Sequence, residues 1–184
     1  MQMKIFLCDG QWTVRALGEE AGMPSRLLQV IALTLAALGL APGATHLLEL
    51  PVKLGYPPAL YAQVTSTLYA LFGPVGGAVQ MAAMAAVAVL AFRSRHLPQG
   101  RLLAASAAAL LASLLLWAFL VAPVNAEWGS STDVSQAEFA AAYARLRGRW
   151  EYGHVAAFVA WLAGWLGMAA AFTMHSPADV GARL

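Results

Sequence analysis

The chain has 184 residues, of which 60% are hydrophobic and only 11% are charged. Soluble domains carry about 25% charged residues, so this composition excludes an ordinary soluble domain. The formal net charge is only +2, and no basic run is long enough to follow a phosphate backbone, which excludes nucleic-acid binding. The single cysteine, Cys8, excludes an intrachain disulfide and any multi-cysteine metal site.

Four apolar runs are each long enough to cross a bilayer as a helix. Ala, Leu, Val and Met dominate them, which favours helices over the alternating strands of a barrel. The sequence therefore predicts an all-α fold, an integral membrane four-helix bundle with up-down topology. The expected parts are an N-terminal juxtamembrane segment without signal-peptide features (1–26), a transmembrane domain (27–174) with spans at 27–50, 61–92, 102–124 and 154–174, and a C-terminal tail (175–184).

The third connection, 125–150, is the longest and has a pattern of its own. Within it Phe139, Tyr143, Leu146 and Trp150 recur at helical spacing. This pattern predicts an amphipathic helix that lies on or caps the outer face and leads into the fourth span.

Basic residues set the expected orientation, because cytoplasmic loops carry an excess of Lys and Arg. The side with both termini has seven and the other side has four, which predicts cytoplasmic termini. The predominance of Arg and Ala is typical of a bacterial protein, so we expect the bacterial inner membrane. The seven are Lys4, Arg15, Arg26, Arg93, Arg95, Arg101 and Arg183, and the four are Lys53, Arg145, Arg147 and Arg149.

Polar residues gather where the expected helices reach the outer face. His46 and Glu49 lie three residues apart at the end of the first span, and Glu151 and His154 repeat that spacing at the start of the fourth. Residues at this spacing share one face of a helix. Ionisable groups within membrane segments normally face the bundle interior or a wet cavity. These four residues are therefore the candidate catalytic group, with histidine as the acid–base residue.

The same four residues leave other readings open. Glu-x-x-His pairs on facing helices bind metals in helix bundles, so His46, Glu49, Glu151 and His154 are also candidate ligands for a single transition metal. A haem held by the two histidines is a less favoured alternative, and a protein without any cofactor is another. The carboxylates could instead pair with Lys53 or the neighbouring arginines in a non-catalytic binding or assembly protein.

Aromatic residues on the second and fourth spans predict a pocket for a lipophilic, planar small molecule. Trp161 and His154 share one stripe of the fourth span, and Tyr61 and Tyr69 share one stripe of the second. Prolines at 42 and 74 remove backbone hydrogen bonds and are expected to kink the first two spans around this pocket. The expected partners are the lipophilic molecule and membrane lipid, and oligomerisation stays open.

Two short motifs carry a resemblance. The stretch "APVNAEW" supplies a proline–x–asparagine pattern with Asn125, and "LRGRWEYGH" supplies an arginine–tryptophan–x–x–x–histidine pattern with Trp150 and His154. Over about residues 27–174 the chain resembles a small four-helix membrane family, mostly of unknown function, that includes the anthrone-oxygenase-like proteins. "HLLELPVKL" looks like the variant first helix of some bacterial members.

The resemblance implies an integral-membrane oxidoreductase or oxygenase. Characterised relatives are linked to the oxidation of polyketide anthrones to quinones by dioxygen, without an obvious bound cofactor. By the same resemblance, Asn125, Trp150 and Arg147 or Arg149 join His154 at the site. The expected function is oxidation of a lipophilic aromatic or phenolic molecule near the outer membrane face.

Overall fold

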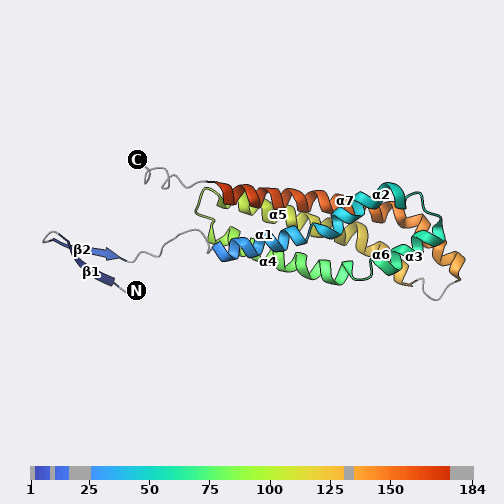
Figure 1. Cartoon of the computed structure of the whole chain (residues 1–184), viewed down its shortest axis with the longest axis horizontal. Coiled ribbons are helices and arrows are strands. Elements are labelled where there is room, and N and C mark those ends of the chain that lie inside the picture. The colour runs from blue at the N-terminus through green and yellow to red at the C-terminus, as the bar shows by residue number, and fades with distance from the viewer. Residues whose placement is uncertain (1–2, 9–10, 17–25, 131–134, 175–184) are drawn as a thin grey trace.

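The computed structural model describes residues 3–8, 11–16, 26–130 and 135–174, and shows an elongated helical bundle (Figure 1). Four helical stretches are long and apolar enough to cross a membrane, which confirms the four-helix membrane bundle. The expected tail, 175–184, lies outside the described residues. The four stretches are Arg26–Lys53, Phe72–Arg93, Gly100–Gly129 and Gln136–Thr173.

Among the described residues, the N-terminal segment departs from an all-α description. Strands β1 (Met3–Cys8) and β2 (Gln11–Ala16) pair in antiparallel fashion, with Met3 opposite Ala16. The strands contain Ile, Val, Thr, Phe and Trp, residue types that favour strands. From the sequence this segment was predicted only to lie next to the membrane, and no strands were predicted in it.

The first span is two helices, α1 (Arg26–Leu38) and α2 (Ala41–Lys53). Leu40 N bonds the carbonyl of Ala37 at 3.1 Å rather than that of Ala36, and the expected kink follows because Pro42 has no N–H to donate. Trp161 Nε1 donates to the freed Ala36 carbonyl at 2.8 Å. In a bilayer such freed carbonyls need partners from neighbouring helices.

The second apolar run is not one helix. It divides into α3 (Pro58–Leu68), the π-helical segment η1 (Phe72–Gly76) and α4 (Gly77–Arg93). Pro74 within η1 cannot donate a backbone hydrogen bond, which breaks the regular ladder. The candidate span therefore starts at Phe72 rather than at 61. A second π-helical segment, η2 (Trp117–Val121), lies between α5 (Gly100–Leu116) and α6 (Ala122–Ser130).

The amphipathic helix and the fourth span are one continuous helix, α7 (Gln136–Thr173). Its first turn is held by a reciprocal capping box between Ser135 and Glu138. A helix of 38 residues is about 57 Å long, longer than a bilayer of about 40–45 Å. The helix is thus longer than one bilayer crossing requires, and its N-terminal part packs with α3 and α6 (Figure 1).

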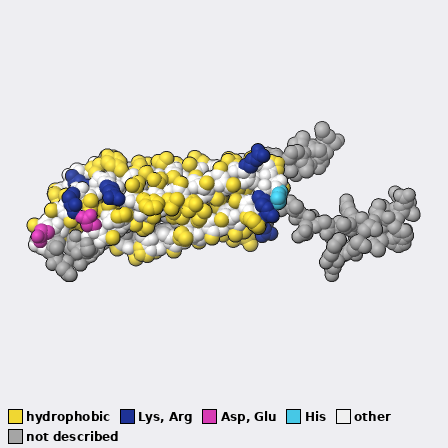
Figure 2. All heavy atoms as spheres, turned by 180° about the vertical axis from the view of Figure 1, so that it is seen from behind, with side chains coloured by type: hydrophobic (Ala, Val, Ile, Leu, Met, Phe, Trp, Pro, Cys, Tyr) yellow, Lys and Arg dark blue, Asp and Glu magenta, His cyan; other side chains and the backbone are white. Residues whose placement is uncertain are grey.

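The four spans close into a ring in which α1 packs on α4 and α7, and α5 packs on the same two helices. Glycines allow the close approach of α5 and α7, because a Cβ at Gly164 would lie 2.7 Å from Leu110 Cδ2. On the face in Figure 2, charged side chains gather at the two ends, and the belt between them is largely hydrophobic. This distribution fits a membrane-spanning protein.

Candidate ligand site

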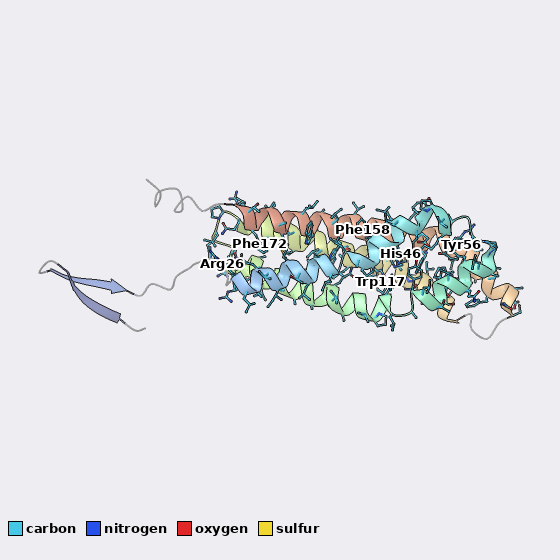
Figure 3. The ribbon with its side chains drawn as sticks, viewed as in Figure 1. Arg26, His46, Tyr56, Trp117, Phe158 and Phe172 are labelled. Atoms are coloured by element: carbon cyan, nitrogen blue, oxygen red, sulfur yellow. The ribbon has the colours of Figure 1, made fainter. Side chains whose placement is uncertain are left out.

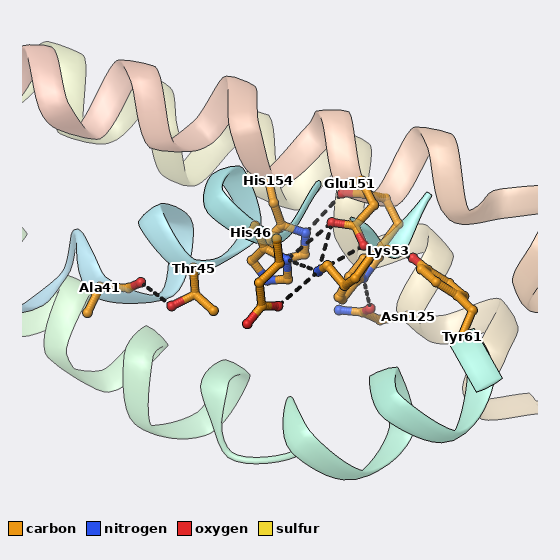
Figure 4. A network of polar contacts seen from close by, with 10 residues as sticks. Ala41, Thr45, His46, Lys53, Tyr61, Asn125, Glu151 and His154 are labelled. Atoms are coloured by element: carbon orange, nitrogen blue, oxygen red, sulfur yellow. Dashed lines mark hydrogen bonds and ion pairs between the residues drawn. The ribbon is translucent and has the colours of Figure 1, made fainter. Parts of the chain in front are cut away.

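A buried ion pair joins the first and last spans. Lys53 Nζ lies 2.9 Å from Glu151 Oε1 and 3.1 Å from Oε2. Tyr61 donates from its hydroxyl to Oε1 at 3.1 Å. Figure 4 shows these contacts converging from α2, α3 and α7. Glu151 is 0% exposed and Lys53 only 2%, so the two charges compensate each other away from bulk water.

The environment of Tyr61 keeps its hydroxyl protonated. Burial raises the pKa of Tyr61, and the neighbouring Glu151 carboxylate raises the pKa further because it disfavours a second negative charge. The phenol therefore acts as a donor to the carboxylate throughout the neutral range. Together with Lys53 it satisfies both oxygens of a carboxylate that would otherwise be costly to bury.

His46 joins this cluster from the face of α2 that also carries Lys53. Its Nδ1 lies 3.4 Å from Glu151 Oε2 and 3.3 Å from Lys53 Nζ. An ammonium group can only donate, so a proton on His46 Nε2 leaves Nδ1 free to accept from Lys53. A proton on Nδ1 is donated to Glu151 instead. The cluster thus supports either tautomer of His46.

His154 stacks on His46, with ring centroids 3.9 Å apart and an interplanar angle of 24°. Its Nδ1 lies 2.9 Å from the Trp150 carbonyl. A carbonyl only accepts, so Nδ1 carries the proton and Nε2 keeps its lone pair. His154 Nε2 makes no hydrogen bond with any other residue that the structure describes.

The residues that carry the family resemblance form one hydrogen-bonded chain. Trp150 Nε1 donates to Asn125 Oδ1 at 2.7 Å, and the Trp150 carbonyl accepts from His154. The amide nitrogen of Asn125, an exposed residue, carries two donors in addition. Although Glu151 lies one helical turn before His154, its carboxylate lies against His46, and the Trp150 carbonyl holds His154.

Glu49 lies at the margin of the cluster, 3.7 Å from Lys53 Nζ, with its side chain 45% exposed. Among the described residues, no three His, Cys, Asp or Glu side chains are placed to hold a metal ion. The Lys53 ammonium lies where a metal would contact Glu151 and His46. The stacked rings of His46 and His154 leave no space for a haem between them. The metal and haem alternatives therefore do not fit these residues.

Two cavities adjoin the histidine pair, and five residues border both. The shared residues are His46, Phe72, Gly73, Trp117 and His154. Both cavities lie within the range of small-molecule sites, about 300–1,000 Å³. Figure 3 shows His46, Trp117 and Phe158 in one stretch of the bundle, with Arg26 and Phe172 at the opposite end.

We call the first space, of about 330 Å³, the glycine cavity. Residues of α2, η1, α4, η2 and α7 border it, and its wall is mostly apolar. The two π-helical segments both contribute to it, as π-bulges frequently do at functional sites. Besides the five shared residues, its lining includes Gly39, Gly43, Gly76, Gly77, Met81, Phe158 and Trp161.

We call the second space, of about 400 Å³, the aromatic cavity. Two of its buried hydroxyls, Tyr69 Oη and Thr65 Oγ1, have no hydrogen-bond partner in the structure. Buried polar groups are normally paired, so unpartnered ones on a cavity wall call for an explanation. Its lining also includes Asn125, Trp128, Phe139, Tyr143 and Trp150.

Some of the other predicted site residues border a cavity and some do not. Tyr69 and Asn125 border the aromatic cavity and Trp161 the glycine cavity, but Tyr61 borders neither. Arg147 also borders neither, because its guanidinium donates to the Tyr56 carbonyl at 3.0 Å. Arg149 likewise donates to a backbone carbonyl, that of Phe119.

Sequence reasoning did not assign the aromatic lining residues Trp117, Trp128, Phe139 and Tyr143 to the site. Trp128 and Tyr143 stack with centroids 4.0 Å apart, across α6 and α7. No spacing rule links residues on different helices, so their pairing had no sequence signal. The position of Lys53 at the centre of the cluster did have a sequence signal. Lys53 lies seven residues after His46 and hence two turns along the same helical face.

Fold and site together define a four-helix membrane protein with a buried ion-pair cluster beside two ligand-sized cavities. No family model, curated protein or solved structure matches this chain.

Proposed function

We propose that this protein is a membrane oxidoreductase that oxidises a lipophilic phenolic molecule with dioxygen, in the manner of the anthrone-oxygenase-like proteins it resembles. The observation that carries the proposal is His154. Its Nδ1 is anchored to the Trp150 carbonyl, its Nε2 has a lone pair, and it borders both cavities. A neutral imidazole with a free ring nitrogen can accept a proton from a carbon acid.

The proposed chemistry needs one base and an apolar space. In an anthrone, the methylene between two aromatic rings is a carbon acid, and His154 Nε2 takes one of its protons. The resulting anion is delocalised onto the ring oxygen, where a hydrogen-bond donor such as the Asn125 amide lowers its energy. Dioxygen then accepts the electrons, so that the methylene becomes a carbonyl and one molecule of water leaves.

The ion-pair cluster has a positioning role in this proposal. Glu151 is fully buried and borders neither cavity, so it does not meet the substrate. It holds His46, and the His46 ring stacks against His154. Lys53 and Tyr61 keep the carboxylate in place. Arg147 and Arg149 have no part in the proposed chemistry, since both guanidiniums are bound to backbone carbonyls.

We also propose a bacterial inner-membrane location with cytoplasmic termini. Arg26 lies at the end of the bundle away from the site (Figure 3), and Arg93, Arg95 and Arg101 lie at the same end, where α4 ends and α5 begins. By the positive-inside rule this end faces the cytoplasm. The site then faces the outer side of the membrane, within reach of molecules that partition into the bilayer.

The test is oxygen uptake by the purified protein with 1,8-dihydroxyanthrone, corrected for oxidation without protein. General-base catalysis contributes about 10²–10⁴-fold, so His154→Ala should lower turnover by that factor. His96→Ala is the matched control, because His96 is an exposed histidine at the opposite end of the bundle. Equal turnover by wild type and His154→Ala would exclude His154 as the base.

A further inference from the structure

The unpartnered hydroxyls and the glycine cavity point to the shape of the ligand. Tyr69 is 8% exposed, and its hydroxyl has no partner although its ring is well packed. The ring stacks on His46 with centroids 4.9 Å apart, and Lys53 Nζ lies 4.5 Å from its centroid. These contacts fix the ring and leave the hydroxyl as an unused donor and acceptor on the wall of the aromatic cavity.

Asn125 offers a second polar group at the exposed margin of the same cavity. Its carbonyl oxygen accepts from Trp150, and its amide nitrogen carries two donors. A ligand oxygen is the natural partner for such a donor. The surrounding walls are rings, including Trp128 and Tyr143, and flat walls suit a planar group. The aromatic cavity is thus built for an oxygen-bearing aromatic head.

The glycine cavity has a different chemistry. A Cβ added at Gly73 or Gly77 would meet no atom within 4 Å, so open space faces both residues. Gly77 lies centrally on the lining face of the helix, between Gly73 and Met81. A larger side chain at Gly77 therefore extends into the cavity.

Two residues on the wall of the glycine cavity also face outward. Met81 is 60% exposed and Trp117 37% exposed, and both lie within candidate membrane spans. Exposed apolar side chains at this level meet lipid, so the cavity borders the hydrocarbon of the bilayer. A hydrocarbon chain can enter there without crossing a polar layer.

We infer that one elongated amphiphile occupies both cavities, with an oxygen-bearing aromatic head beside Tyr69 and Asn125 and a hydrocarbon tail beside Gly77 and Met81. This inference rests on the proposed function, because it names the class of substrate that reaches His154. The histidine pair borders both cavities, so the junction of head and tail lies next to His154. The ligand class is an alkylated phenol, quinol or quinone.

The test is binding rather than turnover. The probes are a decyl-substituted benzoquinone and its methyl-substituted counterpart, titrated into purified protein in nanodiscs. Quinones quench tryptophan fluorescence, and Trp117, Trp128, Trp150 and Trp161 line the cavities. Gly77→Leu should weaken binding of the decyl probe by roughly tenfold and change the methyl probe less than twofold, because it fills only the tail space. Gly77→Val provides a second variant, because it adds a smaller side chain at the same position.

Tyr69→Phe should weaken both probes alike, by roughly three- to tenfold, because it removes one hydrogen bond to the head and keeps the ring. The matched controls are Gly148→Leu, a helical glycine with open space that borders neither cavity, and Tyr152→Phe, an exposed tyrosine. Circular dichroism checks that each variant is folded.

Two results would overturn the inference: Gly77→Leu and Gly77→Val weakening both probes equally, or Tyr69→Phe behaving like Tyr152→Phe. Its failure is separate from that of the proposed function. Head-and-tail binding without any oxygen uptake would contradict the oxidoreductase and leave the amphiphile site intact. Oxygen uptake in the presence of substrate, combined with probe binding that does not depend on tail length, would contradict the amphiphile site and leave the oxidoreductase intact.

Discussion

The two halves of the bundle differ in how they are packed. The half toward Arg26 has a core of aliphatic side chains, and glycines there bring helices into contact. The half with the site has a core of tyrosines and tryptophans around a buried ion pair, with two cavities beside it. Buried charges and open volumes work against close packing, so their presence in this second half fits the ligand site that we propose there.

The largest effect should come from breaking the ion pair. Lys53→Met leaves the Glu151 carboxylate buried without its charge partner, and removing one member of a buried pair costs about 3–5 kcal/mol. The double variant Lys53→Met with Glu151→Leu should recover most of this loss, because no charge remains unpaired. The measurement is the free energy of unfolding in mixed micelles. Simple additivity of the two single losses would show that the charges are not coupled.

A deletion in the aliphatic half should destabilise without touching the site. Leu110 is fully buried, and Leu→Ala changes in cores cost about 2–5 kcal/mol. We therefore expect Leu110→Ala to lower the unfolding free energy by roughly 3 kcal/mol. The affinity of folded molecules for the decyl probe should stay within twofold of wild type. A large change in affinity would mean that the two halves are energetically coupled.

Overpacking in the same half should have a smaller effect. A Cβ at Gly164 would approach Leu110 Cδ2 to 2.7 Å and the Ser106 carbonyl to 3.0 Å. Gly164→Ala should therefore cost about 1–3 kcal/mol in unfolding free energy. Gly148→Ala has open space and serves as the control. Equal stability of the two variants would contradict the close contact between α5 and α7.

The smallest effect concerns the break between α1 and α2. Gln80 Nε2 donates to the Gly39 carbonyl at 3.0 Å. Hydrogen bonds between membrane helices average about 0.6 kcal/mol and reach about 1.7 kcal/mol. Gln80→Met, which keeps the length of the side chain, should lower the unfolding free energy within that range. A loss above 3 kcal/mol would give this contact a larger role than a single hydrogen bond.

The sequence predicted the aliphatic half better than the site. Runs of apolar residues fix the number of spans, because the bilayer dictates their length. Judged by the length of the apolar run alone, α3 was predicted to be part of the second span, because Tyr61 and its neighbours are apolar enough to continue the run. Conversely, the sequence predicted that the fourth span begins at residue 154. In the structure α7 is already helical before this point and continues through Gly148 and Gly153.

The site was predicted as a set of residues but not as a set of contacts. The spacing of His46 with Glu49 and of Glu151 with His154 suggested pairing along each helix. The contacts instead cross between helices, because residues on one face of a helix meet whatever that face packs against. Only the three-dimensional arrangement shows that Glu151 lies against His46 and that the Trp150 carbonyl holds His154.

The central claim is that His154 performs chemistry in one half of the molecule while the other half supplies only stability. One comparison tests it most directly: turnover of 1,8-dihydroxyanthrone per folded molecule for His154→Ala and Leu110→Ala. We expect His154→Ala to lose about 10²–10⁴-fold in turnover while remaining folded, and Leu110→Ala to lose stability while keeping turnover within twofold. Turnover unchanged in His154→Ala, or lost equally in both variants, would contradict the account.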